Sequence, residues 1–262
     1  MCSSDLYFRR IIGLAPEDDG PVWMVNFMHY RAEAAYEDGS RGLTGRQADD
    51  LYMPTTVLHA IGAEVPFYGD VVMQLDTNPP RWDRIGVVRY PTRRSFVEMQ
   101  ARPDFQELVG HKHAGMESTI ITGCRPFAIA EGMRPDPSTW SSLEHAPTAD
   151  DGPVTVIHMM KFAPGGLADG MAKYQEKAGR LVKKYGGGPV AMFEVEGTIM
   201  GDGREWDQVR FVSYPSLRAF FAMVNDPERS EAQGDHRNRA LEYTYTVVVR
   251  STIDSFVTNG AV

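Results

Sequence analysis

Residues 20–30, with the sequence GPVWMVNFMHY, return as GPVTVIHMMKF at residues 152–162. Two dipeptides follow each copy in the same order: Trp82-Asp83 and Tyr90-Pro91 in the first copy, and Trp206-Asp207 and Tyr214-Pro215 in the second. The offset is 132 residues for the first segment and 124 for both dipeptides. Because a constant offset between rare residue types is the signature of an internal repeat, the chain is predicted to be a tandem duplication. Its first copy carries eight extra residues near residues 31–50.

The second copy has the expected element order β-α-β-β-α-β. Short apolar or β-branched segments predict strands at residues 153–162, 190–199, 208–214 and 244–249. Apolar residues at helical spacing predict one helix over residues 171–185 and another that begins after Ser216 and ends at Asp226-Pro227. This order is that of the ferredoxin-like unit, in which both helices cover one face of an antiparallel sheet.

The uncovered face of each sheet must pack against something, and the nearest partner is the sheet of the other copy. The predicted fold class is therefore α+β, with two ferredoxin-like βαββαβ repeats whose antiparallel sheets form an intramolecular pseudo-dimeric α/β barrel. The expected domains are a first repeat at residues 20–131 and a second at 152–257. Residues 1–19 form an N-terminal segment, residues 132–151 a Pro- and Ser-rich linker that cannot order itself, and residues 258–262 a tail.

Composition excludes several classes of protein. The 262 residues carry a formal net charge of −8, which argues against a nucleic-acid partner. No apolar run approaches the ~18 residues of a membrane span, and the first twelve residues lack the apolar centre of a secretory signal. Cys2 and Cys124 are too few for a disulfide framework or a metal cage. We expect a cytoplasmic protein without a nucleic-acid or membrane partner.

Several motifs of the second copy resemble those of a family of small dimeric α/β-barrel proteins that has no assigned function. They are Tyr185-Gly186-Gly187, Glu196-Gly197, Trp206-Asp207, Tyr214-Pro215-Ser216 and Arg237. The first copy has Ile61-Gly62-Ala63 and His113 at two of these places, and the resemblance extends over nearly the whole chain. It implies the barrel fold and a ligand pocket within the barrel. It implies no particular reaction, because the superfamily includes cofactor-free monooxygenases, polyketide cyclases, isomerases and haem enzymes.

The first strand of each copy carries a polar residue among apolar ones. Alternation places these residues on one strand face: Asn26, Met28 and Tyr30 in the first copy, and His158, Met160 and Phe162 in the second. A polar group there needs a partner or a ligand. His158 is a candidate catalytic base, or a core histidine bonded to a nearby carbonyl or carboxylate. Asn26 is a candidate for stabilising an oxyanion, and the other four for shaping a substrate pocket.

His113 and Arg237 occupy equivalent positions directly before the last strand of each copy. His113 is the second candidate for moving protons. Arg237 is a candidate for binding an anionic substrate group, or for an ion pair with Asp207 or Glu194. His111 and His113 would share one face of a strand, but no third ligand is spaced with them, so we expect no metal site.

Together these features predict a cofactor-independent enzyme that cyclises, isomerises or oxygenates a small apolar or aromatic substrate in the barrel pocket. The alternatives are a non-catalytic metabolite-binding protein, a purely structural pseudo-dimer without a cavity, and a haem protein with His158, His113 or His29 as axial ligand. We expect a monomer or a homodimer formed through helix faces. The polar insertion near residues 31–50 is expected to cover one mouth of the barrel as a lid.

Overall fold

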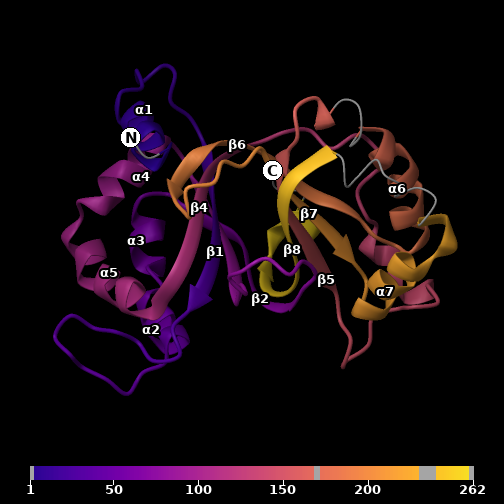
Figure 1. Ribbon diagram of the computed structural model, residues 1–262, viewed down its shortest axis with the longest axis horizontal. Coiled ribbons are helices and arrows are strands. Elements are labelled where there is room, and N and C mark those ends of the chain that lie inside the picture. Colours follow the sequence, from indigo (N-terminus) through magenta and orange to yellow (C-terminus); the bar gives the residue numbers. More distant parts are fainter. Residues whose placement is uncertain (1–2, 168–171, 230–239, 260–262) are drawn as a thin grey trace. The chain divides into compact units, whose positions relative to one another are not determined.

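The computed structural model describes residues 3–167, 172–229 and 240–259, and its elements follow the predicted order in both repeats (Figure 1). The first repeat and the helix before it contain α1 (Ser3–Ile12), β1 (Val22–Tyr30), α2 (Gly45–Tyr52), α3 (Thr55–Ala60), β2 (Glu64–Gln74), β3 (Arg84–Tyr90), α4 (Arg93–Gln100), α5 (Pro103–Gly115) and β4 (Met116–Pro126). The second contains η1 (Pro137–Ser142), β5 (Val154–Phe162), α6 (Ala172–Lys184), β6 (Gly188–Met200), β7 (Gln208–Tyr214), α7 (Leu217–Asn225), β8 (Leu241–Asp254) and α9 (Ser255–Asn259).

The strands are hydrogen-bonded in the closed order β1-β3-β2-β8-β5-β7-β6-β4. Strand β1 pairs antiparallel with β3 and β4, and β5 pairs antiparallel with β7 and β8. The predicted fold class is therefore confirmed: an α+β chain in which two βαββαβ repeats form an α/β barrel.

The chain divides into two compact units, which are described separately. The N-terminal unit comprises Met1–Gly69, Pro79–Arg125 and Val195–Glu205. The C-terminal unit comprises Asp70–Asn78, Pro126–Glu194 and Trp206–Val262. Strands β2 and β6 each begin in one unit and end in the other, so each unit contains a short segment from the other half of the sequence.

Helices α4 and α7 begin in the same way. Thr92 and Ser216 each accept, through the side-chain oxygen, the amide three residues later at 3.0 Å. Asp19 accepts the first two amides of α4 at 2.8 and 3.1 Å, and Asp151 accepts those of α7 at 2.9 and 3.2 Å. These bonds satisfy amides that a helix start leaves without an intrahelical partner. The predicted N-cap at Ser216 is confirmed, and a carboxylate from the preceding segment reinforces it.

Helix α1 is held in the N-terminal unit by one buried tyrosine. Tyr7 is 4% exposed, and its hydroxyl donates to Glu196 Oε2 at 3.2 Å. Arg93 donates to the same carboxylate through Nε at 2.9 Å. A Cβ atom at Gly123 or Gly197 would lie 2.1 or 2.4 Å from the Tyr7 side chain, so glycine at both positions makes room for the ring.

One side of each sheet packs against helices, with α3, α4 and α5 beside β1 and β4 in the N-terminal unit (Figure 1). The buried residues at these interfaces include Met24, Phe96, Met99 and Phe105 in the N-terminal unit, and Val156, Leu181, Phe220 and Met223 in the C-terminal unit. Asn26 follows Met24 by two residues and His158 follows Val156 by two, so both polar residues face the helix side.

The opposite side of the N-terminal sheet is filled with large apolar side chains. Val25, Phe27 and Ile85 are each 0% exposed. The sequence predicts a ligand pocket inside the barrel, which would be on this side of the sheet. The structure instead has its cavity on the side of the sheet that faces the helices. Alternation along a strand with two buried faces cannot distinguish these sides.

The polar insertion, which was expected to form a lid, and the 132–151 linker, which was expected to be unordered, both contain helical structure. The last six residues of the segment 31–50 belong to α2, which Thr44 and Gln47 cap reciprocally. The 132–151 segment contains η1, whose Trp140 is 5% exposed and donates Nε1–H to the Gly186 carbonyl at 2.8 Å. One indole thus supplies the buried area that the polar composition of this segment lacks.

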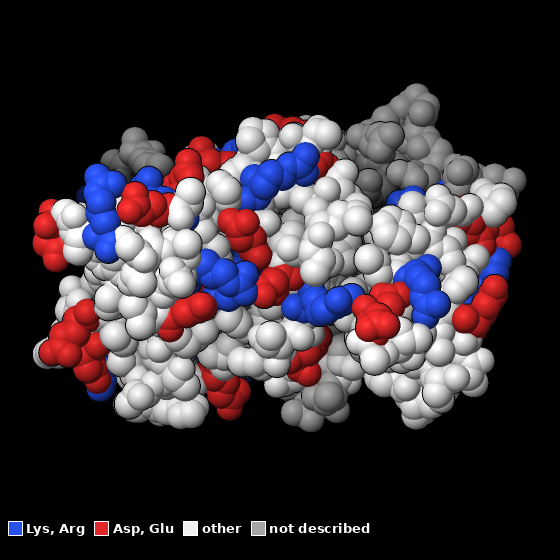
Figure 2. All heavy atoms as spheres, turned by 90° about the horizontal axis from the view of Figure 1, so that it is seen from below, with Lys and Arg blue, Asp and Glu red and all other residues white. Residues whose placement is uncertain are grey.

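Charges of both signs are interspersed on the face of the molecule drawn in Figure 2, where lysine and arginine side chains lie beside aspartate and glutamate side chains. Among the residues described, no helix is long and apolar enough to cross a membrane.

Candidate functional site

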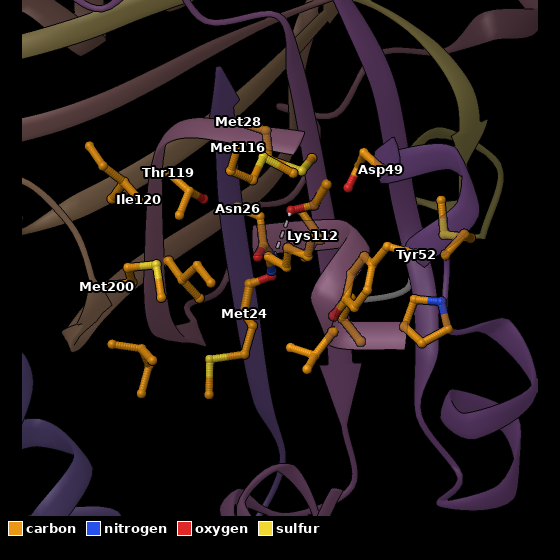
Figure 3. Close-up of a pocket in the computed structure, with 18 of the residues that line it drawn as sticks. Met24, Asn26, Met28, Asp49, Tyr52, Lys112, Met116, Thr119, Ile120 and Met200 are labelled. Atoms are coloured by element: carbon orange, nitrogen blue, oxygen red, sulfur yellow. Dashed lines mark hydrogen bonds between the residues drawn. The ribbon is translucent and has the colours of Figure 1, made fainter. Parts of the chain in front are cut away.

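A cavity of about 530 Å³, here called the N-terminal cavity, lies between the sheet of the N-terminal unit and helices α2 to α5 (Figure 3). All of its lining residues belong to that unit. Its wall is mainly apolar and rich in methionine: Met24, Met28, Met53, Met99, Met116 and Met200. Flexible, polarisable methionine side chains adapt to ligands of different shape. The cavity is large enough for a small organic molecule.

Lys112 places an amine in this apolar wall. It projects from α5 on the same helical stripe as Phe105 and Val109, and it is half-buried. Burial lowers the pKa of Lys112, and the carboxylate of Asp49 opposes this by raising it. The Nζ atom lies 5.1 Å from the ring centroid of Tyr52. Within the described parts of the chain the Lys112 side chain has no hydrogen bond or ion pair, so its amine is available to a ligand.

Asp49, from helix α2, is the acceptor for a buried polar cluster at the cavity wall. Its side chain is 4% exposed, and Oδ2 accepts from the Tyr30 hydroxyl at 2.6 Å and the Tyr68 hydroxyl at 3.2 Å. Arg84 Nη1 donates to the same oxygen at 3.2 Å and to Asp50 Oδ1 at 2.8 Å. Burial, followed by the nearby Asp49 charge, raises the pKa of both tyrosines, so the phenols remain neutral donors.

Asn26 lines the N-terminal cavity from β1, and its amide is directed at the backbone. Nδ2 donates to the Met24 carbonyl at 2.9 Å and to the Gly86 carbonyl at 3.4 Å. The predicted oxyanion role therefore requires a ligand to replace one of these bonds. His113 is exposed near the end of α5 and also lines the cavity.

The two predicted site halves line separate cavities. Asn26, Met28 and His113 line the N-terminal cavity, whereas His158 and Met160 line a second cavity of about 810 Å³ in the C-terminal unit, here called the C-terminal cavity. Among the described residues, neither cavity is lined by members of both groups.

The remaining predicted residues lie elsewhere. Tyr30 is bonded to Asp49, and Phe162 packs with Met160. Arg237 lies outside the described residues, so its predicted role stays a prediction.

The histidines of α5 and β1 that were considered as metal or haem ligands lie as follows. His111 and His113 lie in helix α5 rather than in a strand, and His111 Nδ1 is 2.7 Å from the Tyr36 hydroxyl. His29 Nδ1 is 2.8 Å from Asp83 Oδ2, which also accepts the Tyr30 amide at 2.8 Å. The described residues contain no group of three or more side chains suited to hold a metal ion.

Sequence reasoning overlooked Lys112 and Asp49 for different reasons. Lys112 lies between the two histidines that were compared with metal ligands, but Phe105 and Val109 lie seven and three residues before it on one helical stripe. A cation on that stripe was the available signal. Asp49 lies in the polar insertion, where nothing in the local sequence indicated burial.

No protein-family model matches the sequence, and no curated protein matches it. Among solved structures, the RPA0582 protein of unknown function from Rhodopseudomonas palustris is 28% identical; the match covers 48% of this chain and 92% of that one, with a TM-score of 0.41. An anthrone oxidase-like protein is 14% identical over 92% of this chain and 97% of its own, with a TM-score of 0.50. A chlorite dismutase from Candidatus Nitrospira defluvii is 12% identical over 94% and 97%, with a TM-score of 0.48.

These comparisons concern the fold. At 14% identity, the anthrone oxidase-like protein shares the architecture over nearly the full length of both chains. Together with the closed strand order, this similarity shows that the chain has the dimeric α/β-barrel fold, with both halves supplied by one polypeptide.

Proposed function

We propose that the protein is a cofactor-independent enzyme that binds a small, largely apolar molecule in the N-terminal cavity and removes a proton from it. The observation that carries this proposal is the Lys112 amine in a wall built mostly of methionine and aromatic side chains. An ordinary surface lysine is protonated at neutral pH and cannot accept a proton. Because burial lowers the pKa of Lys112, a larger fraction of this amine is neutral and able to act as a base.

Cyclisation, isomerisation and oxygenation of aromatic or polyketide-like molecules share a first step, the loss of a proton from an acidic C–H or O–H group. Lys112 would accept that proton and, as an ammonium group, would then stabilise the enolate or phenolate that forms. The carboxylate of Asp49 favours the protonated amine, so it assists proton acceptance. His113 lines the same cavity and is a second group able to exchange protons with solvent.

The supporting experiment uses two substrates that lose a proton in different ways: anthrone from a C–H group and 2-naphthol from an O–H group. Anthrone is included because one protein with this fold is described as anthrone oxidase-like. Its oxidation consumes one O₂ and yields anthraquinone and one water, so oxygen uptake and anthraquinone formation should agree. Loss of each substrate is followed in air-saturated buffer with the native protein, Lys112→Met and Lys184→Met.

We expect turnover of at least one substrate by the native protein, and a fall in kcat of about 100-fold or more in Lys112→Met, the usual scale for loss of a general base. Lys184→Met removes an exposed amine that lines neither cavity, and should leave kcat unchanged. Equal rates in Lys112→Met and the native protein would overturn the role of Lys112. Saturable binding without turnover would indicate the metabolite-binding alternative, and a Soret band in the purified protein the haem alternative.

A further inference from the structure

We propose that Lys112 is also a nucleophile, which joins an aromatic aldehyde in the N-terminal cavity as an imine. The amine is the one on which the proposed function rests, but imine formation requires no turnover of the ligand. Two features of the molecule support this assignment. The Lys112 amine has no acceptor within the described parts of the chain, and its cavity suits a neutral aromatic carbonyl compound.

Lys112 differs from other lysines of the chain in its surroundings. Among the lysines whose side chains are described, Lys161, Lys183 and Lys184 each donate a hydrogen bond of 2.8 to 3.1 Å to a carboxylate or carbonyl oxygen. Lys112 has no such acceptor there, and its Nζ atom lies 5.1 Å from the ring centroid of Tyr52. An ammonium group in this position lacks the hydrogen bonds that would compensate for its burial, whereas a neutral amine needs them less.

The electrostatic environment of Lys112 favours the neutral amine. Burial lowers the pKa of Lys112, and the Asp49 carboxylate offsets this only in part. At Lys184 the hydrogen bond to Asp226 instead raises the pKa. Because the unprotonated amine is the species that attacks a carbonyl carbon, Lys112 is the more reactive of the two at neutral pH.

The charges along the cavity wall determine which class of ligand reaches this amine. Besides the tyrosines, the ionisable residues that line the cavity with Lys112 are Asp49, His113, Glu117 and Asp202. Three carboxylates and one lysine give the lining a net negative charge, which disfavours a carboxylate or phosphate ligand. A neutral carbonyl compound is not repelled, and its electrophilic carbon is the atom that a neutral amine attacks.

The apolar part of the wall favours an aromatic group on that carbonyl. Methionine and aromatic side chains line the cavity, and Figure 3 draws Lys112 among them with Met116 and Tyr52. A volume of about 530 Å³ holds a bicyclic ring, which would bury its apolar surface there. A cavity that excludes water also favours the imine over its hydrolysis. An aldehyde is expected rather than a ketone, because its carbonyl carbon is less crowded.

Imine formation is a condensation without oxidation or reduction. Lys112 Nζ attacks the aldehyde carbon, and a C–N bond forms. The nitrogen gives up its two protons, the aldehyde oxygen takes up two and leaves as water, and the C–N bond becomes a C=N bond. One neutral amine and one aldehyde therefore yield one imine and one water. His113, which lines the same cavity, is able to exchange these protons with solvent.

The test treats the native protein at pH 7 with 2-naphthaldehyde and sodium cyanoborohydride, which reduces an imine to a stable secondary amine. Peptide mapping by mass spectrometry then measures the initial rate of labelling at each lysine. The same reaction is run with Lys112→Met, with Lys184→Met, and with native protein in excess 2-naphthalenemethanol, which has the same ring but forms no imine. Lys184→Met is the matched control, because it removes an exposed amine that lines neither cavity.

We expect Lys112 to be labelled at least about tenfold faster than any other lysine, because the cavity holds the aldehyde beside a neutral amine. The alcohol should slow this labelling, Lys184→Met should leave it unchanged, and Lys112→Met should show no compensating increase at other lysines. The map of the native protein decides even if Lys112→Met does not fold. Equal labelling rates over all lysines, or a rate at Lys112 that the alcohol does not change, would overturn the proposal.

The outcome also separates the imine from the proposed function. Fast labelling of Lys112 without turnover of anthrone or 2-naphthol would support the imine, although the proposed function would then fail. Turnover that depends on Lys112 without its preferential labelling would overturn the imine and retain Lys112 as a base.

Discussion

Replacing Asp49 with asparagine tests whether the buried cluster at the N-terminal cavity depends on its negative charge. The substitution keeps the size of the side chain and one carbonyl oxygen, which still accepts the Tyr30 hydroxyl at the site of the present 2.6 Å bond. It removes the charge that faces Arg84, whose side chain is 6% exposed. Arg84 keeps Asp50 as a carboxylate partner at 2.8 Å, but the Asp50 side chain is 55% exposed and screened by water.

The expected loss of stability follows from these contacts. Removing one partner of a buried ion pair costs about 3–5 kcal/mol. The remaining Asp50 contact and the retained amide oxygen reduce this to about 2–3 kcal/mol. For a chain of this length each kcal/mol lowers Tm by about 2–4 °C, so we expect Tm to fall by about 4–12 °C. Thermal melting followed by circular dichroism at pH 7 measures the change.

Asp50→Asn is the matched control, because Asp50 contacts the same Arg84 Nη1 atom and loses the same charge. Since Asp50 is exposed, its replacement should cost less than about 1 kcal/mol. Similar losses in the two variants would refute the argument that burial, rather than pairing alone, makes Asp49 important.

A second consequence concerns Lys112. Without the Asp49 charge the pKa of Lys112 falls further, so any Lys112-dependent turnover should extend to lower pH in Asp49→Asn.

Three further substitutions test other contacts. Lys112→Met should raise the free energy of unfolding by about 1 kcal/mol or more at pH 7, because it removes a desolvated charge. The folded-state pKa of Lys112 lies below its ordinary value of 10.5, so the gain in stability of Lys112→Met should shrink as the pH rises toward that value. Urea titrations at pH 7 and pH 10 measure this gain. An equal gain at both pH values would contradict the reasoning. Gly123→Ala should destabilise the protein by about 1–3 kcal/mol, because its Cβ atom would lie 2.1 Å from the Tyr7 hydroxyl. The control is Gly110→Ala on α5, whose Cβ atom would have no atom within 4 Å. It should be neutral or stabilising when both variants are compared by thermal melting. Trp140→Phe should cost about 1 kcal/mol by removing the 2.8 Å bond to the Gly186 carbonyl, and an unchanged Tm would show that this bond contributes nothing.

Local sequence determined the architecture of this protein. The helical spacing and the Ser216 N-cap predicted the elements of the second copy, and the repeated segments predicted the same outline for the first, because periodicity and capping depend on residues close together in the chain. The alternation that places Asn26 with Met28, and His158 with Met160, was also correct, since it follows from strand geometry alone.

Only the tertiary structure decided which side of each sheet holds a cavity. Strands with both faces buried are apolar on both, so Phe27 and Met24 give equivalent patterns although one packs in a filled core and the other lines a cavity. The tertiary structure also brought Asp49, from a polar insertion, within 3.2 Å of Arg84, which lies 35 positions further along the chain. Contacts between residues this distant in sequence depend on packing, and local sequence carries no record of them.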